Sequence, residues 1–414
     1  LALADLPLYI PPVAGILTAV KQTPLAHLNL LASSRGTPNA FVAQIVEHPG
    51  VIDWALHGTP TAVAVGDATA RLRPLTDVQY AEYLSRAELG VVDVRHADLV
   101  GAPTFVDLRS VTPAEAATLV PLIGGKCAGM ATLAAVPGVV TPPRPMAVTV
   151  AAYAAHIAPI EGEIESLLTD PDFAADARAR FVALEGPDAY AAEQGASPKA
   201  LEWLDQLRAT HPAGTVLGDI MAAGGLRRRI RDLPPQPGLT SALDEALETQ
   251  FAPLSLAQGV RFRSSSTAED VTGFNGAGLY DSNTGFGQPP ADESGHTYIW
   301  ALLKTWGSYW SFEAFEERRK ARIEHLQGRM AALVHPRFED ELEDGNAVAT
   351  AFVTRTATGL EELLVVNAQP GSQSVTNPGA GTVAQAEIDR VEGAVGSASS
   401  VDRPQRSELS GGAP

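Results

Sequence analysis

Cysteine is almost absent from this 414-residue chain, in which Cys127 is the single example. One thiol cannot form an internal disulfide, and no Cys/His cluster has the spacing of a zinc site. A reducing, cytoplasmic setting is therefore the expectation. Long hydrophobic runs are absent too, since no stretch approaches 18 uncharged apolar residues, and we expect no membrane span.

Basic residues are scarce relative to acidic ones, with 30 Lys and Arg against 48 Asp and Glu and a formal net charge of −18. Such a surface repels a phosphate polymer, which argues against a nucleic-acid partner. A site for a smaller anion has to gather a few Lys, Arg and backbone N–H groups locally. Hydrophobic residues make up 45% of the chain, enough for more than one core.

The pattern along the chain predicts α/β and α+β architecture in two folded parts. Residues 1–75 carry short apolar runs at 13–20, 39–46 and 61–66 between Gly/Pro turns, with one short helix, and predict a small α/β domain. Residues 76–104 read as an acidic linker. The chain starts at Leu1 rather than Met, and we expect a fragment of a longer protein.

The second part is predicted to span residues 105–390. Residues 105–258 contain a strand near 104–111, a glycine turn at 124–126 that runs into a helix, and a mostly helical insert over 151–250. Residues 259–390 predict a strand from Val260, a long helix from Tyr298 to Arg329, and strands at 330–335, 347–354 and 362–369. The Ser/Gly/Ala-rich residues 391–414 predict a disordered tail.

His27 lies in the first turn of the predicted short helix, after Thr23–Pro24, which disfavours helix before it. Unpaired backbone N–H groups and the positive end of the dipole gather there and favour a phosphate. A neutral imidazole nitrogen is also a competent nucleophile toward phosphorus. An ordinary surface or capping histidine is the alternative.

Two further segments could hold phosphate. In Gly124-Gly125-Lys126 the glycines allow close backbone approach and the lysine supplies a point charge, although a plain glycine turn with a solvated lysine has the same composition. Arg263 leaves a strand into hydroxyl residues, and its planar fork suits phosphate oxygens. Arg261 alternates onto the same strand face, so either arginine could be the ligand.

These segments carry a family resemblance. Residues 15–42 resemble the phosphohistidine swivelling domain of phosphoenolpyruvate synthase, pyruvate phosphate dikinase and the starch (glucan, water) dikinases, although Ala26 replaces the usual Ser or Cys. Residues 260–282, VRFRSSSTAED…GFNGAGLYDS, resemble the ATP-grasp nucleotide domain of the same family. The GGK turn, the helix over 304–319 and the strand over 330–334 resemble further motifs of that domain, in family order.

The resemblance implies roles for individual residues. Lys126 and Arg263 would contact the phosphates of ATP, and Gly278 and Ser282 would sit in the loop that covers them. His335 stands near the nucleotide, where the family has glutamine. Phosphorylation of His27 would release AMP and phosphate, and an acceptor such as pyruvate or a glucan would then receive the phosphoryl group.

The resemblance is incomplete at the metal. Mg²⁺ is expected from the family, but its acidic pair and Gln-x-Arg motif are not found, and the acidic run over 339–344 is typical of a solvated loop. The metal ligands therefore remain unknown. A non-catalytic ATP-binding protein and a scaffold derived from this family stay open as alternatives, and the oligomeric state is not readable.

Overall fold

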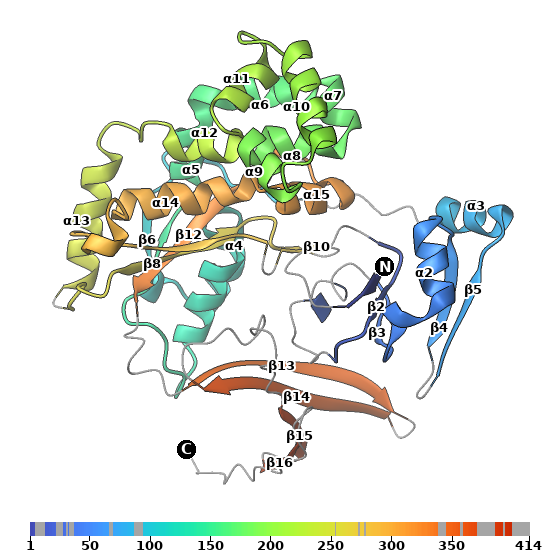
Figure 1. Ribbon diagram of the computed structural model, residues 1–414. Coiled ribbons are helices and arrows are strands. Elements are labelled where there is room, and N and C mark those ends of the chain that lie inside the picture. Colours follow the sequence, from blue (N-terminus) through green and yellow to red (C-terminus); the bar gives the residue numbers. More distant parts are fainter. Residues whose placement is uncertain are drawn as a thin grey trace. The chain divides into compact units, whose positions relative to one another are not determined.

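The computed structural model describes residues 1–4, 13–21, 28–29, 32, 37–65, 69–86, 94–252, 254–271, 274–276, 279–337, 345–356, 359–370, 386–391 and 394–399 (Figure 1). The chain divides into two compact units. Unit 1 combines Leu1–Gly90 with Phe338–Pro414, and unit 2 is Val91–Arg337. The domain boundaries drawn from the sequence stay predictions.

Unit 2 is built on a five-stranded antiparallel sheet. Its strands are β6 (Phe105–Asp107), β7 (Met146–Val148), β8 (Val260–Ser266), β11 (Ser282–Gly285) and β12 (Met330–Pro336), in the order β11-β8-β12-β7-β6. The sheet therefore takes strands from both sides of the boundary predicted at 258. A separate antiparallel pair is formed by β9 (Asp270–Val271) and β10 (Phe274–Asn275).

Each face of this sheet packs against a different helix. α14 (Tyr298–Gly307) contacts β11, β8 and β12, whereas α4 (Pro113–Ala134) contacts β8, β12 and β7. Alternate residues of one strand follow this division: Ala332 and Val334 belong to the larger core, while Leu333 packs with Ile123 and Cys127 of α4. Period-two alternation in a strand produces two such faces.

The long helix α4 starts earlier than the sequence predicted. Thr112 caps it with a reciprocal capping box, in which its side chain accepts from Glu115 N–H and the Glu115 carboxylate accepts from Thr112 N–H. Gly124 interrupts the helix with φ 75° and ψ 168°. The predicted glycine turn therefore exists as a break between two helical segments.

In the described part of the chain, one helix is long and apolar enough to cross a membrane, judged by length and composition alone. This helix is α4. The core helix of a globular protein meets the same criterion. Here Gly124 breaks the helix, and Ile123, Cys127 and Ala131 pack against the sheet. These contacts are those of a core helix.

The insert over 151–250 is helical, as the sequence predicted (Figure 1). Its helices are α5 (Val150–Ile157), α6 (Glu161–Leu168), α7 (Pro171–Ala175), α8 (Ala177–Glu185), α9 (Pro187–Glu193), α10 (Pro198–Thr210), α11 (Val216–Ala222), α12 (Leu226–Asp232) and α13 (Leu239–Phe251). Side-chain caps from Asp170, Asp176, Ser197 and Thr215 start four of them. Each cap satisfies a backbone N–H that has no partner within its helix.

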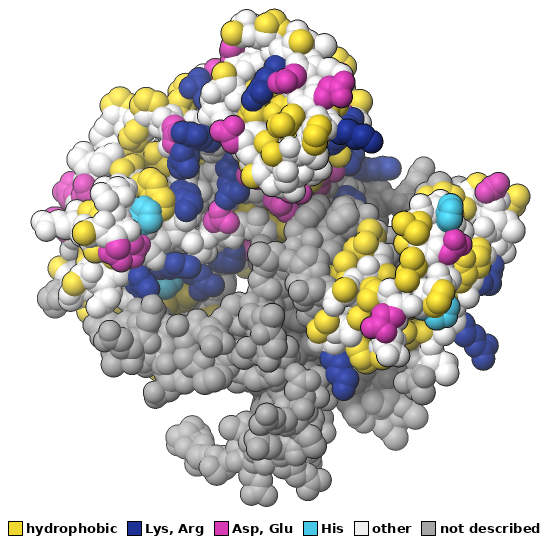
Figure 2. Space-filling view, in the orientation of Figure 1, with side chains coloured by type: hydrophobic (Ala, Val, Ile, Leu, Met, Phe, Trp, Pro, Cys, Tyr) yellow, Lys and Arg dark blue, Asp and Glu magenta, His cyan; other side chains and the backbone are white. Residues whose placement is uncertain are grey.

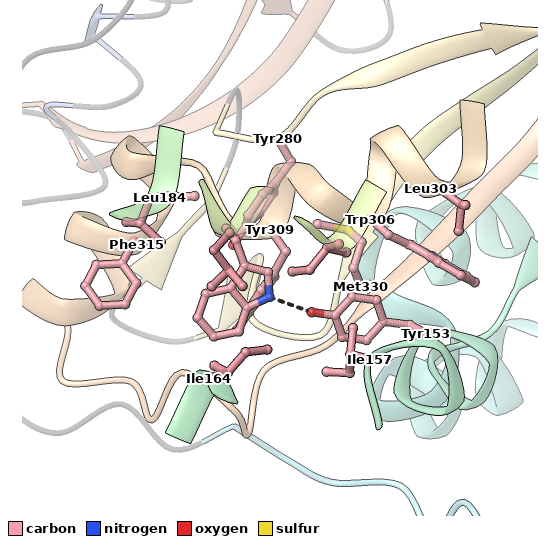
Figure 3. Packing of buried hydrophobic residues seen from close by; sticks show 14 of the residues in the cluster. Tyr153, Ile157, Ile164, Leu184, Tyr280, Leu303, Trp306, Tyr309, Phe315 and Met330 are labelled. Carbon is pink, nitrogen blue, oxygen red and sulfur yellow. Dashed lines mark hydrogen bonds between the residues drawn. The ribbon is translucent and has the colours of Figure 1, made fainter. Parts of the chain in front are cut away.

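Aromatic side chains fill the core between the insert and the sheet (Figure 3). Trp310 donates its indole N–H to the Tyr153 hydroxyl at 3.0 Å, and the rings of Tyr280 and Tyr309 stack with centroids 6.0 Å apart. Arg318 is fully buried, with its guanidinium 3.7 Å from the Tyr309 ring centroid. The cation is thus accommodated by aromatic faces.

The continuous helix predicted from Tyr298 to Arg329 is wrong. α14 ends at Gly307, a 3₁₀ turn covers Ser308–Trp310, and α15 (Phe312–Lys320) begins after it. Ser311 starts α15 in an extended conformation, and its hydroxyl accepts from Ala314 N–H. A serine cap competes with helix continuation here, which apolar periodicity alone does not reveal.

The described residues of unit 1 form three separate sheets. β1 (Ala2–Leu3), β2 (Ile16–Thr18) and β3 (Asn39–Phe41) form a parallel sheet, and β4 (Thr61–Val65) pairs with β5 (Ala70–Pro74). The strands β13 (Gly345–Thr356), β14 (Gly359–Pro370), β15 (Ala386–Val391) and β16 (Ala394–Ser399) form a third, antiparallel sheet. β16 lies in the stretch predicted to be disordered.

Unit 1 also has, among its described residues, α2 (Pro49–Leu56) and α3 (Asp77–Arg86), and α3 falls within the predicted linker. In the short helix predicted after Thr23–Pro24, Leu28, Asn29 and Ala32 are helical. Leu28 and Ala32 pack with Ile16 in a small core. The mixed α/β content agrees with the predicted fold class, while the swivelling phosphohistidine domain stays a prediction.

Candidate nucleotide site

The break in α4 brings the helix backbone against strand β8. A Cβ added to Gly124 would lie 2.0 Å from the Ser265 carbonyl oxygen, so glycine is required both by this approach and by its positive φ. The Ser265 hydroxyl donates to Ile123 O at 2.8 Å and accepts from Cys127 N–H at 3.0 Å. It thus satisfies one backbone group on each side of the break.

Lys126 follows this break and turns toward the end of β8. Its ammonium donates to the Ser264 hydroxyl at 3.1 Å and forms an ion pair with Glu269. The Lys126 side chain is 28% exposed, whereas that of Glu269 is 2% exposed. The lysine therefore has a buried side held by partners and an open side.

Arg263 lies on the same side of the sheet as α4. Arg263 and Ser265 are two residues apart in β8 and project from one face, and Ser265 contacts α4. The Arg263 side chain is exposed, and its neighbour Ser264 is the partner of Lys126. Lys126 is therefore linked to the residue that follows Arg263 in β8.

Cross-strand pairing adds polar residues to the sheet face that carries Arg263. We call this face, together with Lys126, the basic face. Ser282 of β11 lies opposite Arg263, and on the far side of β8 His335 of β12 lies opposite Arg261. Arg261 donates to the Thr284 hydroxyl at 3.0 Å. Residues directly opposite each other share a sheet face, so the two arginines, Ser282 and His335 form one polar surface. Figure 2 shows dark-blue Lys and Arg side chains grouped over this part of unit 2.

His335 is buried and neutral in this surface. Burial, followed by the charges of Arg263 and Arg261, lowers the pKa of its imidazole to about 4, and a bond to the Pro336 carbonyl acts in the opposite direction. Its Nδ1 lies 2.8 Å from Pro336 O and therefore donates to it. The histidine contributes a polar ring to the site but no charge at neutral pH.

The segment before Ser282 is tied to the helical insert. Asp281 forms an ion pair with Arg227 of α12, which also contacts Glu185 at 3.2 Å. Glu185 in turn accepts from Phe312 N–H at 2.9 Å. These contacts join the predicted phosphate-covering loop to the insert, and no local pattern in the sequence indicates them.

Sequence reasoning also missed Glu269. This residue follows Arg263 by six positions within the predicted motif, and a lone carboxylate there gives no sign of its partner. The signal that could have found it is the pairing of a lysine after two glycines with an acid after a serine run. That pairing joins residues 143 positions apart.

Two predicted site residues, His27 and Gly278, lie outside the described residues. The metal prediction left the ligands unknown. Within the described ranges, no three or more His, Cys, Asp or Glu side chains gather in a way that could hold a metal ion. Glu269 and Asp281 are engaged by Lys126 and Arg227, and the residues that would hold Mg²⁺ stay unassigned.

The chain matches a family of known proteins. The family model described as the AMP/ATP-binding domain of pyruvate phosphate dikinase matches residues 120–379, more than half of the 414-residue chain. The matched range contains Lys126, Arg263, Ser282 and His335. A search of curated proteins found no match to the chain. The chain belongs to the family of pyruvate phosphate dikinase AMP/ATP-binding domains.

Proposed function

We propose that this chain binds ATP on the basic face of unit 2 and uses it to phosphorylate His27, as a dikinase-type phosphotransferase of the cytoplasm. The observation that carries the proposal is the contact of Lys126 with Ser264, the residue after Arg263 in β8, inside the range that matches the nucleotide-binding family. In a chain with a net charge of −18, this local concentration of positive charge is where a triphosphate can be held.

Each residue of the face has a distinct part in the proposal. Lys126 acts as a point charge, whereas the Arg263 guanidinium offers a planar pair of donors to phosphate oxygens. The Ser282 hydroxyl, opposite Arg263, adds a neutral donor. Uncharged His335 can bond a polar group of the nucleotide without adding charge. An ATP-grasp fold for the nucleotide-binding domain is part of this proposal.

The transfer step rests on His27. Its imidazole nitrogen would attack the β-phosphorus of ATP, with AMP leaving, and hydrolytic loss of the γ-phosphate would leave one phosphoryl group on the ring. This group then passes to an acceptor such as pyruvate or a glucan. Because no described residue is assigned to Mg²⁺, no step is assigned to a metal.

Incubation with ATP labelled in the β-phosphate tests this function. Acid-labile label should appear on the wild-type chain and on His48→Ala, which alters an exposed histidine of the same unit, but be absent from His27→Ala. Label on His27→Ala at the wild-type level would refute the role of His27.

A second candidate is a non-catalytic ATP-binding protein. The observation that favours it is that the described part of the chain brings no three potential metal ligands together. Phosphoryl transfer depends heavily on a divalent cation that neutralises the ATP charge. This candidate predicts that ATP raises the melting temperature of the chain while no AMP forms.

A further inference from the structure

Glu269 connects three parts of the candidate site. Its Oε1 accepts from the Lys126 ammonium, its Oε2 accepts from Ser266 N–H at 3.4 Å, and its backbone carbonyl accepts from Gly276 N–H at 2.8 Å. Glu269 therefore contacts α4 through Lys126, the end of β8 through Ser266, and the residue after β10 through Gly276. Its side chain is only 2% exposed.

A buried carboxylate is unfavourable unless it is paired and hydrogen-bonded. Both oxygens of Glu269 have a partner, and the ammonium of Lys126 neutralises the charge. These contacts therefore hold the Glu269 carboxylate in one position. Holding the flexible lysine stem in one conformation before a ligand arrives removes part of the entropy that binding would otherwise cost.

The geometry also leaves Lys126 able to bind a phosphate. An ammonium has three N–H donors. Among the described residues, Ser264 and Glu269 engage two of them, and the side chain is still 28% exposed. The third donor can reach an anion on the open side.

We propose that Glu269 is a positioning residue, which holds the Lys126 ammonium so that its remaining N–H faces the phosphates of the nucleotide. This inference rests on the proposed ATP site. A carboxylate beside Lys126 can also weaken ATP binding, because it offsets the charge of Lys126 and competes with phosphate for the ammonium. Positioning and competition predict opposite changes in affinity when Glu269 is altered.

Glu269→Gln separates the two. A glutamine carries one carbonyl oxygen, so it cannot accept from both Lys126 and Ser266 N–H, and its NH₂ would face one of these donors. Positioning then predicts about 10-fold weaker ATP binding by the full-length chain in isothermal titration. Binding of adenosine, which has no phosphates, should not change. ATP binding that is equal to wild type or tighter would overturn the proposal.

Glu316→Gln is the matched control. Glu316 is a buried acid, 8% exposed, that accepts from Arg180 and Arg319 away from the basic face. This variant also loses a buried ion pair, and it should bind ATP and adenosine as the wild type does. A similar loss of ATP binding in Glu316→Gln would mean that general destabilisation explains the effect, which contradicts positioning.

A double-mutant cycle tests the route through Lys126. In a Lys126→Met background, Glu269→Gln should cause no further loss of ATP affinity, because the side chain being positioned is already gone. An undiminished 10-fold loss in that background would overturn the proposal. Where Glu269→Gln does not fold, Glu269→Asp keeps the charge but is one methylene shorter, and wild-type ATP affinity in it would equally overturn it.

Failure of the proposed function and failure of the positioning role give different results. If the wild-type chain binds no ATP, the proposed function fails. If the wild type binds ATP and the Glu269 variants bind it equally well, the nucleotide site stands and the positioning role of Glu269 is wrong.

Discussion

Gly124 is the residue whose backbone conformation places Lys126 against the sheet. Its φ of 75° is unfavourable for other residues, and an added Cβ would lie 2.0 Å from the Ser265 carbonyl oxygen. Gly124→Ala should therefore destabilise the chain by about 2 kcal/mol or more, since the backbone at residue 124 or at Ser265 has to move to relieve the clash. Urea unfolding monitored by circular dichroism measures the change.

Gly129 provides the control within the same helix. A Cβ added there meets nothing within 4 Å, and its φ is ordinary. Gly129→Ala should leave stability unchanged or raise it by up to about 1 kcal/mol, because alanine favours helix. Equal unfolding midpoints for Gly124→Ala and the wild type would show that the break does not depend on glycine.

His335 predicts a pH dependence of stability. Its folded-state pKa is about 4, below the value near 6.5 of an unfolded histidine, so the unfolded chain binds a proton more readily in this window. Its contribution to stability is present above pH 6.5 and is lost as the pH falls toward 4, on the order of 3 kcal/mol. Unfolding free energies measured across this range should fall less steeply for His335→Gln.

Individual residues differ in how far the sequence revealed them. Lys126 and Arg263 were predicted because their types and flanking glycines or serines suit phosphate. Arg261 and Arg263 were left as alternatives, and the structure puts both on one face, with Arg261 bonded to Thr284. Glu269 was not anticipated, because burial and a partner on α4 depend on tertiary packing that a local motif does not encode.

At the scale of elements, the start of α4 depends on its capping box. Thr112→Ala removes the side chain that accepts from Glu115 N–H and should cost about 1 kcal/mol of stability in urea unfolding. Thr118→Ala, on an exposed turn of the same helix, is the comparison and should have a smaller effect. Equal losses in both variants would contradict the capping role.

Elements with a strong local signal were predicted well. β8, β12 and the helical insert follow from period-two and helical spacing. The prediction of one long helix over 298–329 was wrong because Ser311 caps a new helix within a stretch whose Trp310 and Phe315 both belong to the core. Apolar periodicity predicted burial there correctly but could not reveal that one helix ends at Gly307 and another begins at Phe312.

At the scale of the whole molecule, composition and family agree on a small anion as ligand. The net charge of −18 disfavours a phosphate on most of the surface, and the family match covers Lys126, Arg261 and Arg263. The arrangement of unit 1 relative to unit 2 could not be predicted, because no local pattern encodes how two separately packed units approach each other.

Titration of ATP into the full-length chain and two variants tests the central claim most directly. In the proposed site, Lys126→Met and Arg263→Met would each lose a charge-assisted hydrogen bond to phosphate, and each should weaken ATP binding about 10-fold or more. Arg178→Met, an exposed arginine of the insert paired with Asp176, should bind ATP as the wild type does. Wild-type ATP affinity in both Lys126→Met and Arg263→Met would contradict the account.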